Sequence, residues 1–402
     1  MPLQCRTGQR CRLCARPRLP ALALALLALV ILDSITSAAA QEVRPARTPN
    51  GGLQPQAVVD SKGAAHLVYL KGDPAHCDVF YSRRVDGSTA FTVPMRVNDV
   101  PGSAIALGTV RGAQLAVGSN GRVHVVWNGS QSQGNGVRGA PMLYARLDST
   151  GRRFEPQRNL MTSTIDLDGG GSVAVGANGR VYVFWHGHAK NGPDDEVHRG
   201  VYLALSTDDG STFASEQRVA VGGVCACCGL KAFATGTNIV AVVYRSADDQ
   251  ANRDSRLLVS ADAGQSFRSV LLGPWHISAC PMSTPALGLD PSGALFAMWE
   301  TEGQVYRGSF LPQTLAPPVQ ALPAGGTGTD RKHPAFAFSR GREPFLLTTW
   351  TEGTGWAKGG SLAWECIDLT RGAKRTGAAA GVPPWTFPAV VPEADGSFTI
   401  LY

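Results

Sequence analysis

The most constraining feature of the sequence is an aromatic residue that recurs at nearly constant spacing, each time closing a short apolar segment. The seven aromatics are 58, 58, 59, 55, 51 and 52 residues apart. Self-similarity at such a period indicates a repeat array, in which each unit buries its apolar faces against its neighbours. The segments are Ala65–Tyr69, Val123–Trp127, Val181–Trp185, Ile239–Tyr244, Leu295–Trp299, Phe345–Trp350 and Phe398–Tyr402.

The repeating units carry the signals of antiparallel hairpins. Asn120-Gly121 and Asn178-Gly179 each separate two alternating apolar runs, a strong short-range hairpin signal. In six of the seven units a second hairpin follows, as in Val201–Leu205 and Phe213–Val219. Four antiparallel strands per unit predict an all-β propeller, because a single twisted sheet cannot cover both of its own faces.

The number of blades follows from the hairpin count. Seven first hairpins are present but only six second ones, so we expect Pro388–Tyr402 to complete a blade with a strand from Gln41–Leu53. This count favours seven blades over six, the alternative in which the last hairpin lies elsewhere. The composition agrees, since 47 Gly and 26 Pro among 402 residues suit many short strands joined by tight turns.

The first forty residues have the pattern of an export signal. Five arginines precede the apolar run Leu19–Leu32, and small residues lead to Ala40. We therefore expect a signal peptide over residues 1–40, cleavage near Ala40, a propeller domain over residues 41–402 and a secreted or periplasmic protein. No later run is long enough for a transmembrane segment in the mature chain. Residues 1–40 carry +4 of the net +6, which disfavours a nucleic-acid partner.

Two turns carry the most specific motif. Ser206–Phe213 and Ser260–Phe267 both read Ser-x-Asp-x-Gly-x-Ser/Thr-Phe. In such a turn Asp accepts backbone hydrogen bonds, Gly supplies a positive φ and Phe anchors the loop. These turns resemble the Asp boxes, or BNR repeats, of the sialidase-like β-propeller superfamily, and the repeat extends the resemblance over most of residues 54–402. The resemblance implies six blades and a carbohydrate-active protein.

The order of strands in a blade predicts which rim of the ring carries the chemistry. Antiparallel pairing places the links between blades and the loops between second and third strands on one rim. Six of the eight histidines and five of the six cysteines after residue 40 fall on those segments. We therefore expect a functional site at that rim of the central channel.

The first interpretation of this rim is glycan binding or glycoside hydrolysis, as the resemblance implies. Sialidases hold a sugar carboxylate with an arginine cluster and use acidic residues in catalysis. The candidates for ligand binding are Arg111, Arg245, Arg331 and His333. The candidates for catalysis are Glu300, Glu302 and Glu352. The Arg-Ile-Pro element of sialidases is absent from the first blade, so sialidase activity itself is disfavoured.

The second interpretation is a metal or redox site, because thiolate, imidazole and thioether groups suit copper or zinc. The candidate ligands are Cys225, Cys227, Cys228, His276, Cys280 and Met282. In an exported protein the competing expectation is disulfides, for example between Cys280 and one member of the cluster and between Cys77 and another.

A third interpretation is a non-catalytic platform that presents its rim to a glycan, another small molecule or a protein. Four tryptophans end strands near this rim and are candidates either for stacking on sugar rings or for core packing between blades. They are Trp127, Trp185, Trp299 and Trp350.

Overall fold

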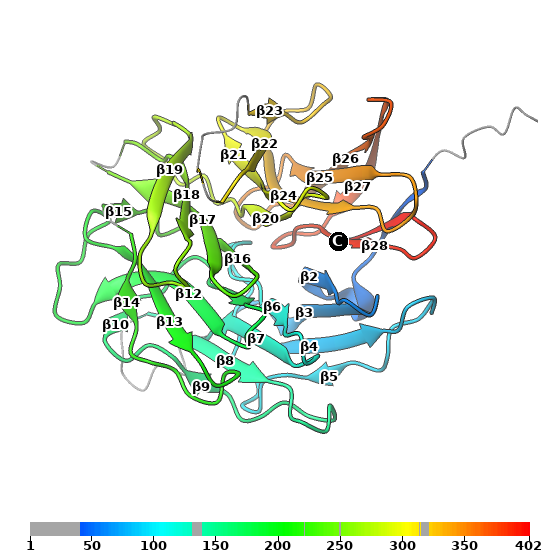
Figure 1. The fold of residues 1–402 in the computed structure, drawn as a ribbon. Coiled ribbons are helices and arrows are strands. Elements are labelled where there is room, and N and C mark those ends of the chain that lie inside the picture. Colours follow the sequence, from blue (N-terminus) through cyan, green and yellow to red (C-terminus); the bar gives the residue numbers. More distant parts are fainter. Residues whose placement is uncertain (1–40, 131–138, 221, 249–250, 313, 315–320) are drawn as a thin grey trace, which may run out of the picture. The chain divides into compact units, whose positions relative to one another are not determined.

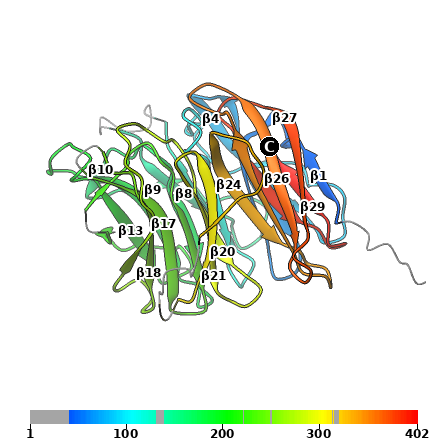
Figure 2. The ribbon, with the colours of Figure 1, turned by 90° about the horizontal axis from the view of Figure 1, so that it is seen from above.

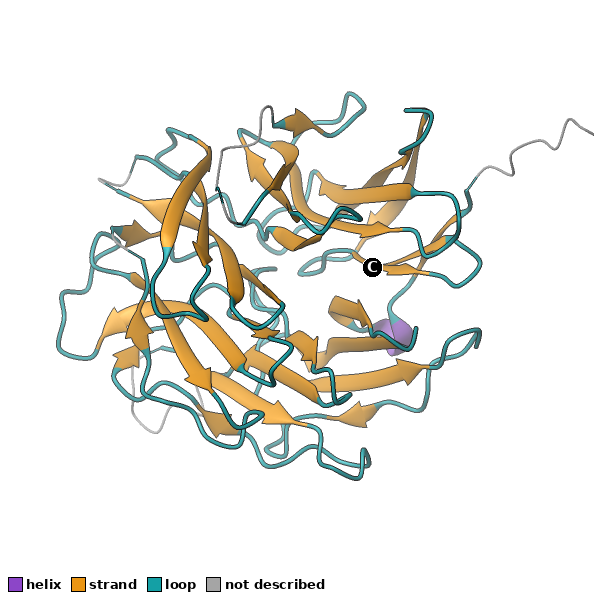
Figure 3. Cartoon of the chain, viewed as in Figure 1, coloured by secondary structure: helices purple, strands orange, loops and turns teal. Residues whose placement is uncertain are grey.

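The computed structural model describes residues 41–402 except 131–138, 221, 249–250, 313 and 315–320. The predicted signal peptide lies outside the described residues. The described chain consists of β-strands and loops, with one short 3-10 turn, η1 (Pro49–Gly51) (Figure 3). Within the described part of the chain, no helix has the length and apolar character needed to cross a membrane.

The first three blades are antiparallel sheets of consecutive strands. The first contains β2 (Leu53–Val59), β3 (Ala65–Asp73), β4 (His76–Arg84) and β5 (Met95–Arg96). The second contains β6 (Gln114–Val117), β7 (Val123–Asn128), β8 (Met142–Arg146) and β9 (Arg158–Asn159). The third contains β11 (Ser172–Val175), β12 (Val181–Ala189), β13 (Gly200–Ser206) and β14 (Gln217–Arg218), and β10 (Thr164–Ile165) extends it along β12.

The next three blades repeat this plan. The fourth contains β16 (Lys231–Thr235), β17 (Ile239–Ala247), β18 (Ser255–Ser260) and β19 (Arg268–Gly273), and β15 (Gly223–Val224) extends it along β17. The fifth contains β20 (Ala286–Leu289), β21 (Leu295–Thr301), β22 (Gln304–Phe310) and β23 (Leu322–Pro323). The sixth contains β24 (Arg331–Phe338), β25 (Phe345–Glu352), β26 (Gly360–Asp368) and β27 (Lys374–Val382).

The seventh blade closes the ring and has three strands: β28 (Ala389–Pro392), β29 (Phe398–Leu401) and β1 (Val43–Ala46). β1 pairs in parallel with β29, with Val43 opposite Phe398. No hairpin joins these two strands, so their relative direction is unconstrained by a turn. The expected seventh blade is confirmed, and the six-blade alternative is wrong.

We call the strand of each blade that lies nearest the centre of the ring in Figure 1 its inner strand, and the outer strands lie at the periphery. The inner strands are β2, β6, β11, β16, β20, β24 and β28. Each inner strand contacts the inner strand of the next blade, and β28 contacts β2. A view turned by 90° shows the sheets standing side by side (Figure 2). The chain therefore forms a closed seven-bladed β-propeller.

The tryptophans that end the second strands are packed between blades. Trp127, Trp185, Trp299 and Trp350 are each at most 2% exposed. Trp127 belongs to an apolar cluster built from the first and second blades, and Trp299 to one built from the fourth and fifth. Core packing is confirmed for these four side chains, since a sugar ring cannot reach a buried aromatic face.

The predicted aspartate turns have the expected hydrogen bonds. The backbone N–H of Ser266 donates to Asp262 Oδ1 at 2.9 Å, and Ser260 Oγ donates to the same oxygen at 2.7 Å. Gly264 has φ +91°, a conformation that disfavours larger side chains. Phe267 packs edge-on against Phe184 of the third blade at 6.1 Å. Each turn thus anchors its own blade to the preceding one.

Two buried histidines predict a pH-dependent stability. His66 and His124 each bond a tyrosine hydroxyl at 2.8 Å, and burial lowers the pKa of both rings despite a neighbouring aspartate. Below pH 6.5 the unfolded chain therefore binds more protons than the folded one. From pH 7.5 to 5.5 the free energy of unfolding should fall, each histidine contributing a slope of up to about 1.4 kcal/mol per pH unit.

Denaturant unfolding at a series of pH values measures this slope. His66→Asn and His124→Asn should each reduce it, because each variant removes one proton-binding group from the unfolded chain. A pH-independent free energy of unfolding across this range would contradict the prediction.

Candidate functional site

The candidate site lies where the inner strand of the fourth blade is divided. β15 pairs with Ser246 and Ala247 at the far end of β17, whereas β16 pairs with Ile239–Val243. Residues 225–230 connect these two short strands and are not part of the ladder. The Cys-Ala-Cys-Cys sequence therefore lies in the loop between β15 and β16.

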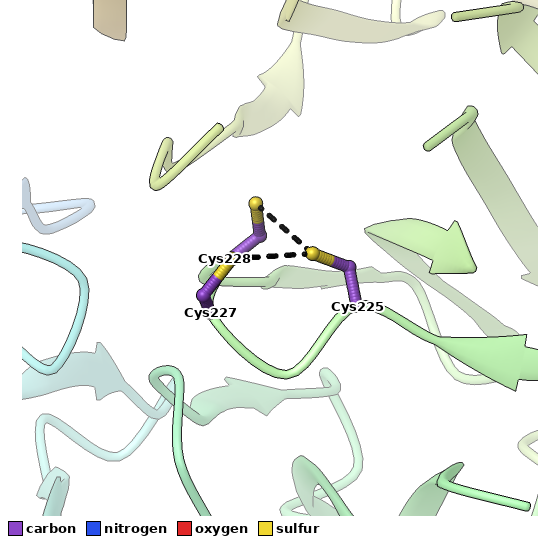
Figure 4. Close-up of side chains that lie close together, drawn as sticks. All are labelled: Cys225, Cys227 and Cys228. Carbon is purple, nitrogen blue, oxygen red and sulfur yellow. Dashed lines mark hydrogen bonds between the residues drawn. The ribbon is translucent and has the colours of Figure 1, made fainter. Parts of the chain in front are cut away.

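Three thiols converge on this loop (Figure 4). Cys225 Sγ lies 3.4 Å from Cys227 Sγ and 3.7 Å from Cys228 Sγ, and all three sulfurs lie within 4.8 Å of one another. Zn–S bonds of about 2.3 Å in tetrahedral geometry place sulfurs about 3.8 Å apart. The spacing of the three sulfurs is therefore close to that of a metal–thiolate site.

The predicted disulfides are not present among the described residues. All six cysteines from Cys77 to Cys366 are free thiols, and the closest sulfurs are well beyond the disulfide bond length of about 2.0 Å. Cys77, which was expected to reach the cluster, is 1% exposed in the core between the first two blades. Burial there raises the pKa of its thiol to about 12. That expectation was wrong because Cys77 packs in a different part of the ring.

Of the other candidate ligands, Cys280 interacts with Cys227 but lies outside the group of three sulfurs. It follows β19 in the link to the fifth blade and is exposed. A hydrogen bond from the Cys227 thiol lowers the pKa of Cys280 to about 7, so Cys280 ionises readily near neutral pH. His276 is also exposed, but its ring bonds Asn252 at 3.1 Å and is outside the group of three sulfurs. Met282 is partly buried and has a positive φ of 50°.

A buried ion pair lies beside the thiols. Arg245 Nη2 lies 3.3 Å from Glu300 Oε2, and these side chains are 6% and 0% exposed. Burial raises the pKa of Glu300 to about 7, although the guanidinium opposes this shift. Burial also opposes ionisation of Cys228, but hydrogen bonds from Cys225 and Cys227 and the charge of Arg245 bring its pKa below the usual value. Arg245 thus favours the thiolate form of Cys228, whereas hydrogen bonding to Cys228 and burial raise the pKa of Cys225 and that of Cys227.

The backbone of the cysteine loop is held from the neighbouring blades. His186 Nε2 bonds the Cys228 carbonyl at 3.1 Å, and the Gly229 N–H donates to the Ser283 carbonyl at 3.0 Å. A Cβ at Gly169 would lie 2.2 Å from the Cys228 carbonyl oxygen, so this close approach requires glycine. Contacts from the third and fifth blades therefore hold the loop in place before any ligand binds.

Each of the three candidate arginines is paired with a carboxylate. Arg111 bonds Asp168, and Arg245 bonds Glu300. Arg331 Nε donates to Glu352 Oε1 at 3.1 Å and is 1% exposed. These pairs neutralise much of the charge that a shared sugar carboxylate would need. His333 is 2% exposed and stacked on Phe387, and burial lowers its pKa to about 3, so its ring is neutral.

The three candidate catalytic glutamates have different surroundings. Glu300 is 1% exposed, so a substrate reaches it only if the surrounding loops move. Glu302 is exposed in the two-residue turn between β21 and β22, with φ 56°. Glu352 accepts hydrogen bonds from Arg331 and from Trp350 Nε1, the latter at 2.9 Å. Their catalytic role stays a prediction.

Sequence reasoning missed the residues that support the loop. Glu196 accepts a hydrogen bond from Ala226 N at 3.3 Å and another from Arg253 at 2.6 Å. Strand order placed most histidines at one rim, but it indicated no partner for His186 and none for Glu196. It also missed Lys231, whose only signal was a charged residue within the otherwise apolar segment Leu230–Ala234.

The comparisons support the fold. No family model matches the chain, and no curated protein matches it. Among solved structures, a protein of unknown function from Dyadobacter fermentans is 15% identical with a TM-score of 0.55, covering 85% of this chain and 97% of that one. Its likeness agrees with the propeller architecture and shows the fold alone.

Two further structural matches carry names. Hadza microbial sialidase Hz136 is 13% identical with a TM-score of 0.49, covering 80% of this chain and 70% of that one. A Trypanosoma rangeli sialidase in complex with the inhibitor DANA is 11% identical with a TM-score of 0.49, covering 78% and 56%. The strand topology defines the class as a β-propeller, and the activity has to be argued from the site.

The buried ion pair predicts a stability effect. Arg245→Leu leaves the Glu300 carboxylate buried without its partner and should cost about 3–5 kcal/mol of unfolding free energy. The double variant Arg245→Leu with Glu300→Leu should cost less than the sum of the single variants, because both charges are removed together. Denaturant unfolding measures all three values. Additive effects, or a single-variant cost within error of zero, would contradict the prediction.

Proposed function

We propose that the protein is an exported metal-binding propeller that holds one soft or borderline ion, Cu(I) or Zn(II), at the channel rim. The thiolates of Cys225, Cys227, Cys228 and Cys280 bind the ion. The observation that carries this proposal is the convergence of three cysteine sulfurs within 4.8 Å of one another, with Cys280 beside Cys227. Thiolates are the ligands that these ions prefer.

The surroundings of the cluster support a bound cation. Several adjacent thiolates repel one another, and a positive ion removes that repulsion. The guanidinium of Arg245 also favours a thiolate at Cys228, and the backbone contacts hold the loop in its binding conformation. In an oxidising compartment, which the predicted signal peptide implies, metal coordination also protects adjacent thiols from disulfide formation.

The exposure of the ligands indicates how the ion exchanges. Cys225 and Cys228 are at most 2% exposed, whereas Cys280 is exposed and lies on a separate blade link. Cys280 is therefore the ligand that is exposed to solvent, and the ion enters and leaves the site past Cys280. This arrangement suits a carrier or a donor of metal ions. His276 and Met282, in the same blade link as Cys280, are candidate outer ligands during exchange.

Metal analysis tests the proposal. Protein exported and purified without chelators should contain about one copper or zinc ion per chain. Cys227→Ser and Cys280→Ser should lower this content by at least tenfold, because each removes one thiolate ligand. Cys366→Ser is the matched control, since Cys366 lies buried in β26 within another apolar cluster. Thiol titration should find the cluster reduced after the metal is removed.

Two results would overturn this proposal. One is a chain that takes up neither ion when Cu(I) or Zn(II) is supplied in excess to the reduced protein. The other is metal uptake that Cys227→Ser leaves unchanged.

A second candidate function, glycan binding, is favoured by a separate observation. Trp356, in the loop between β25 and β26, is 56% exposed. The Trp356 ring and the Arg111 side chain both pack on Gly108 and are therefore neighbours. A Cβ at Gly108 would lie 2.9 Å from Trp356 and 2.7 Å from Arg111. An exposed indole beside a guanidinium is a surface on which a sugar ring can stack and hydrogen-bond. Glu300, Glu302 and Glu352 are the candidates if hydrolysis follows.

A glycan array with sialosides and neutral oligosaccharides tests this second function. Trp356→Ala should weaken any binding by about tenfold or more, and Trp356→Phe should retain part of it. Val197→Ala, which truncates another exposed apolar residue, is the control. Glycan binding that Trp356→Ala does not change would place the ligand elsewhere, and turnover lost in Glu302→Gln would identify a hydrolase.

A further inference from the structure

The channel enclosed by the inner strands contains a cavity of about 480 Å³. Its walls are mainly apolar side chains from all seven blades, among them Val58, Val117, Val175, Ala234, Leu289 and Val390. Binding sites for small molecules have volumes of this order and are mostly apolar, with a few polar groups that orient the ligand. The cavity therefore has the size and character of a ligand site.

One charged side chain enters this apolar cavity. Lys231, at the start of β16, is the single charged residue among the described residues that line it. Its Nζ donates to Gln114 Oε1 at 2.6 Å and to Gln56 Oε1 at 3.2 Å. Both glutamines come from inner strands of other blades. Since each amide oxygen accepts from the ammonium group, each amide NH2 group remains as a donor.

The charge of Lys231 has no compensating carboxylate among the described residues of the cavity wall. Burial lowers the pKa of its amine to about 8, so the ammonium form still predominates at pH 7. Lys231 is only partly exposed, and an ammonium group that is shielded from water is costly unless an anion pairs with it. Two neutral amides satisfy hydrogen bonds of the ammonium group but leave its charge unbalanced. A negative charge bound inside the channel would balance it.

We propose that the channel binds an organic monocarboxylate, with its carboxylate on Lys231 and its apolar body along the Val, Ala and Leu side chains of the inner strands. One negative charge matches the single ammonium group, and the amide groups of Gln56 and Gln114 supply further donors. The wall offers a single positive charge, which disfavours a multiply charged, strongly hydrated inorganic anion such as phosphate. This inference does not depend on the proposed metal site or on glycan binding at Trp356.

Calorimetric titration of the full chain with benzoate tests the proposal, with benzyl alcohol and inorganic phosphate as comparison probes. Benzoate should bind with a stoichiometry of one, and the other two probes should bind at least tenfold more weakly. Lys231→Met should lower the affinity for benzoate by at least tenfold, and Lys231→Arg should restore part of it. Lys71→Met is the matched control, because Lys71 is exposed on β3. Thermal melting checks that each variant is folded.

A measurement on the unmodified chain keeps the test decisive if Lys231→Met does not fold. Acetic anhydride should acetylate Lys231 more slowly when benzoate is present, whereas acetylation of Lys71 should not change. Peptide mass spectrometry reads both sites in the same sample. Unchanged labelling of Lys231, equal binding of benzyl alcohol, or binding of phosphate without benzoate would overturn the proposal.

Discussion

The structure depends on one packing constraint: each blade is a twisted sheet with two apolar faces, and neither can remain in water. Neighbouring blades cover these faces, and the aromatic residue at the end of each second strand fills the space between them, as Trp127 and Trp299 do. The first and last blades have the same requirement. The ring therefore closes, and the parallel pair β1–β29 ties the beginning of the described chain to its end.

The contacts between blades stabilise the closed ring, so the loops that connect the strands are available for binding or catalysis. The rim instead depends on buried polar contacts, above all the Arg245–Glu300 pair and the contacts of His186 and Ser283 with the cysteine loop. These contacts hold thiols from two blade links together without a disulfide. The same ring leaves an apolar channel whose single described charge is Lys231. Two chemically distinct sites thus arise from one architecture.

The strands were largely predictable because their signals are local. All seven aromatic-ended segments begin at the residues where β3, β7, β12, β17, β21, β25 and β29 begin. The divided inner strands were not predictable. Asp166 lies between β10 and β11 with φ 66°, and His333 marks a shift of register within β24 with φ 53°. These irregularities arise where the chain crosses from one blade to the next, and no short-range pattern encodes them.

The sequence by itself determined the repeat and the all-β class and favoured seven blades over six, since periodicity and strand alternation are properties of neighbouring residues. Only the tertiary structure decided which side chains meet. It brought Cys280 to Cys227, paired Arg245 with Glu300 and separated Cys77 from the cluster. It also left Lys231 without a carboxylate among the described residues of the cavity wall. Such contacts join residues many tens of positions apart, and their distances depend on how the whole ring closes.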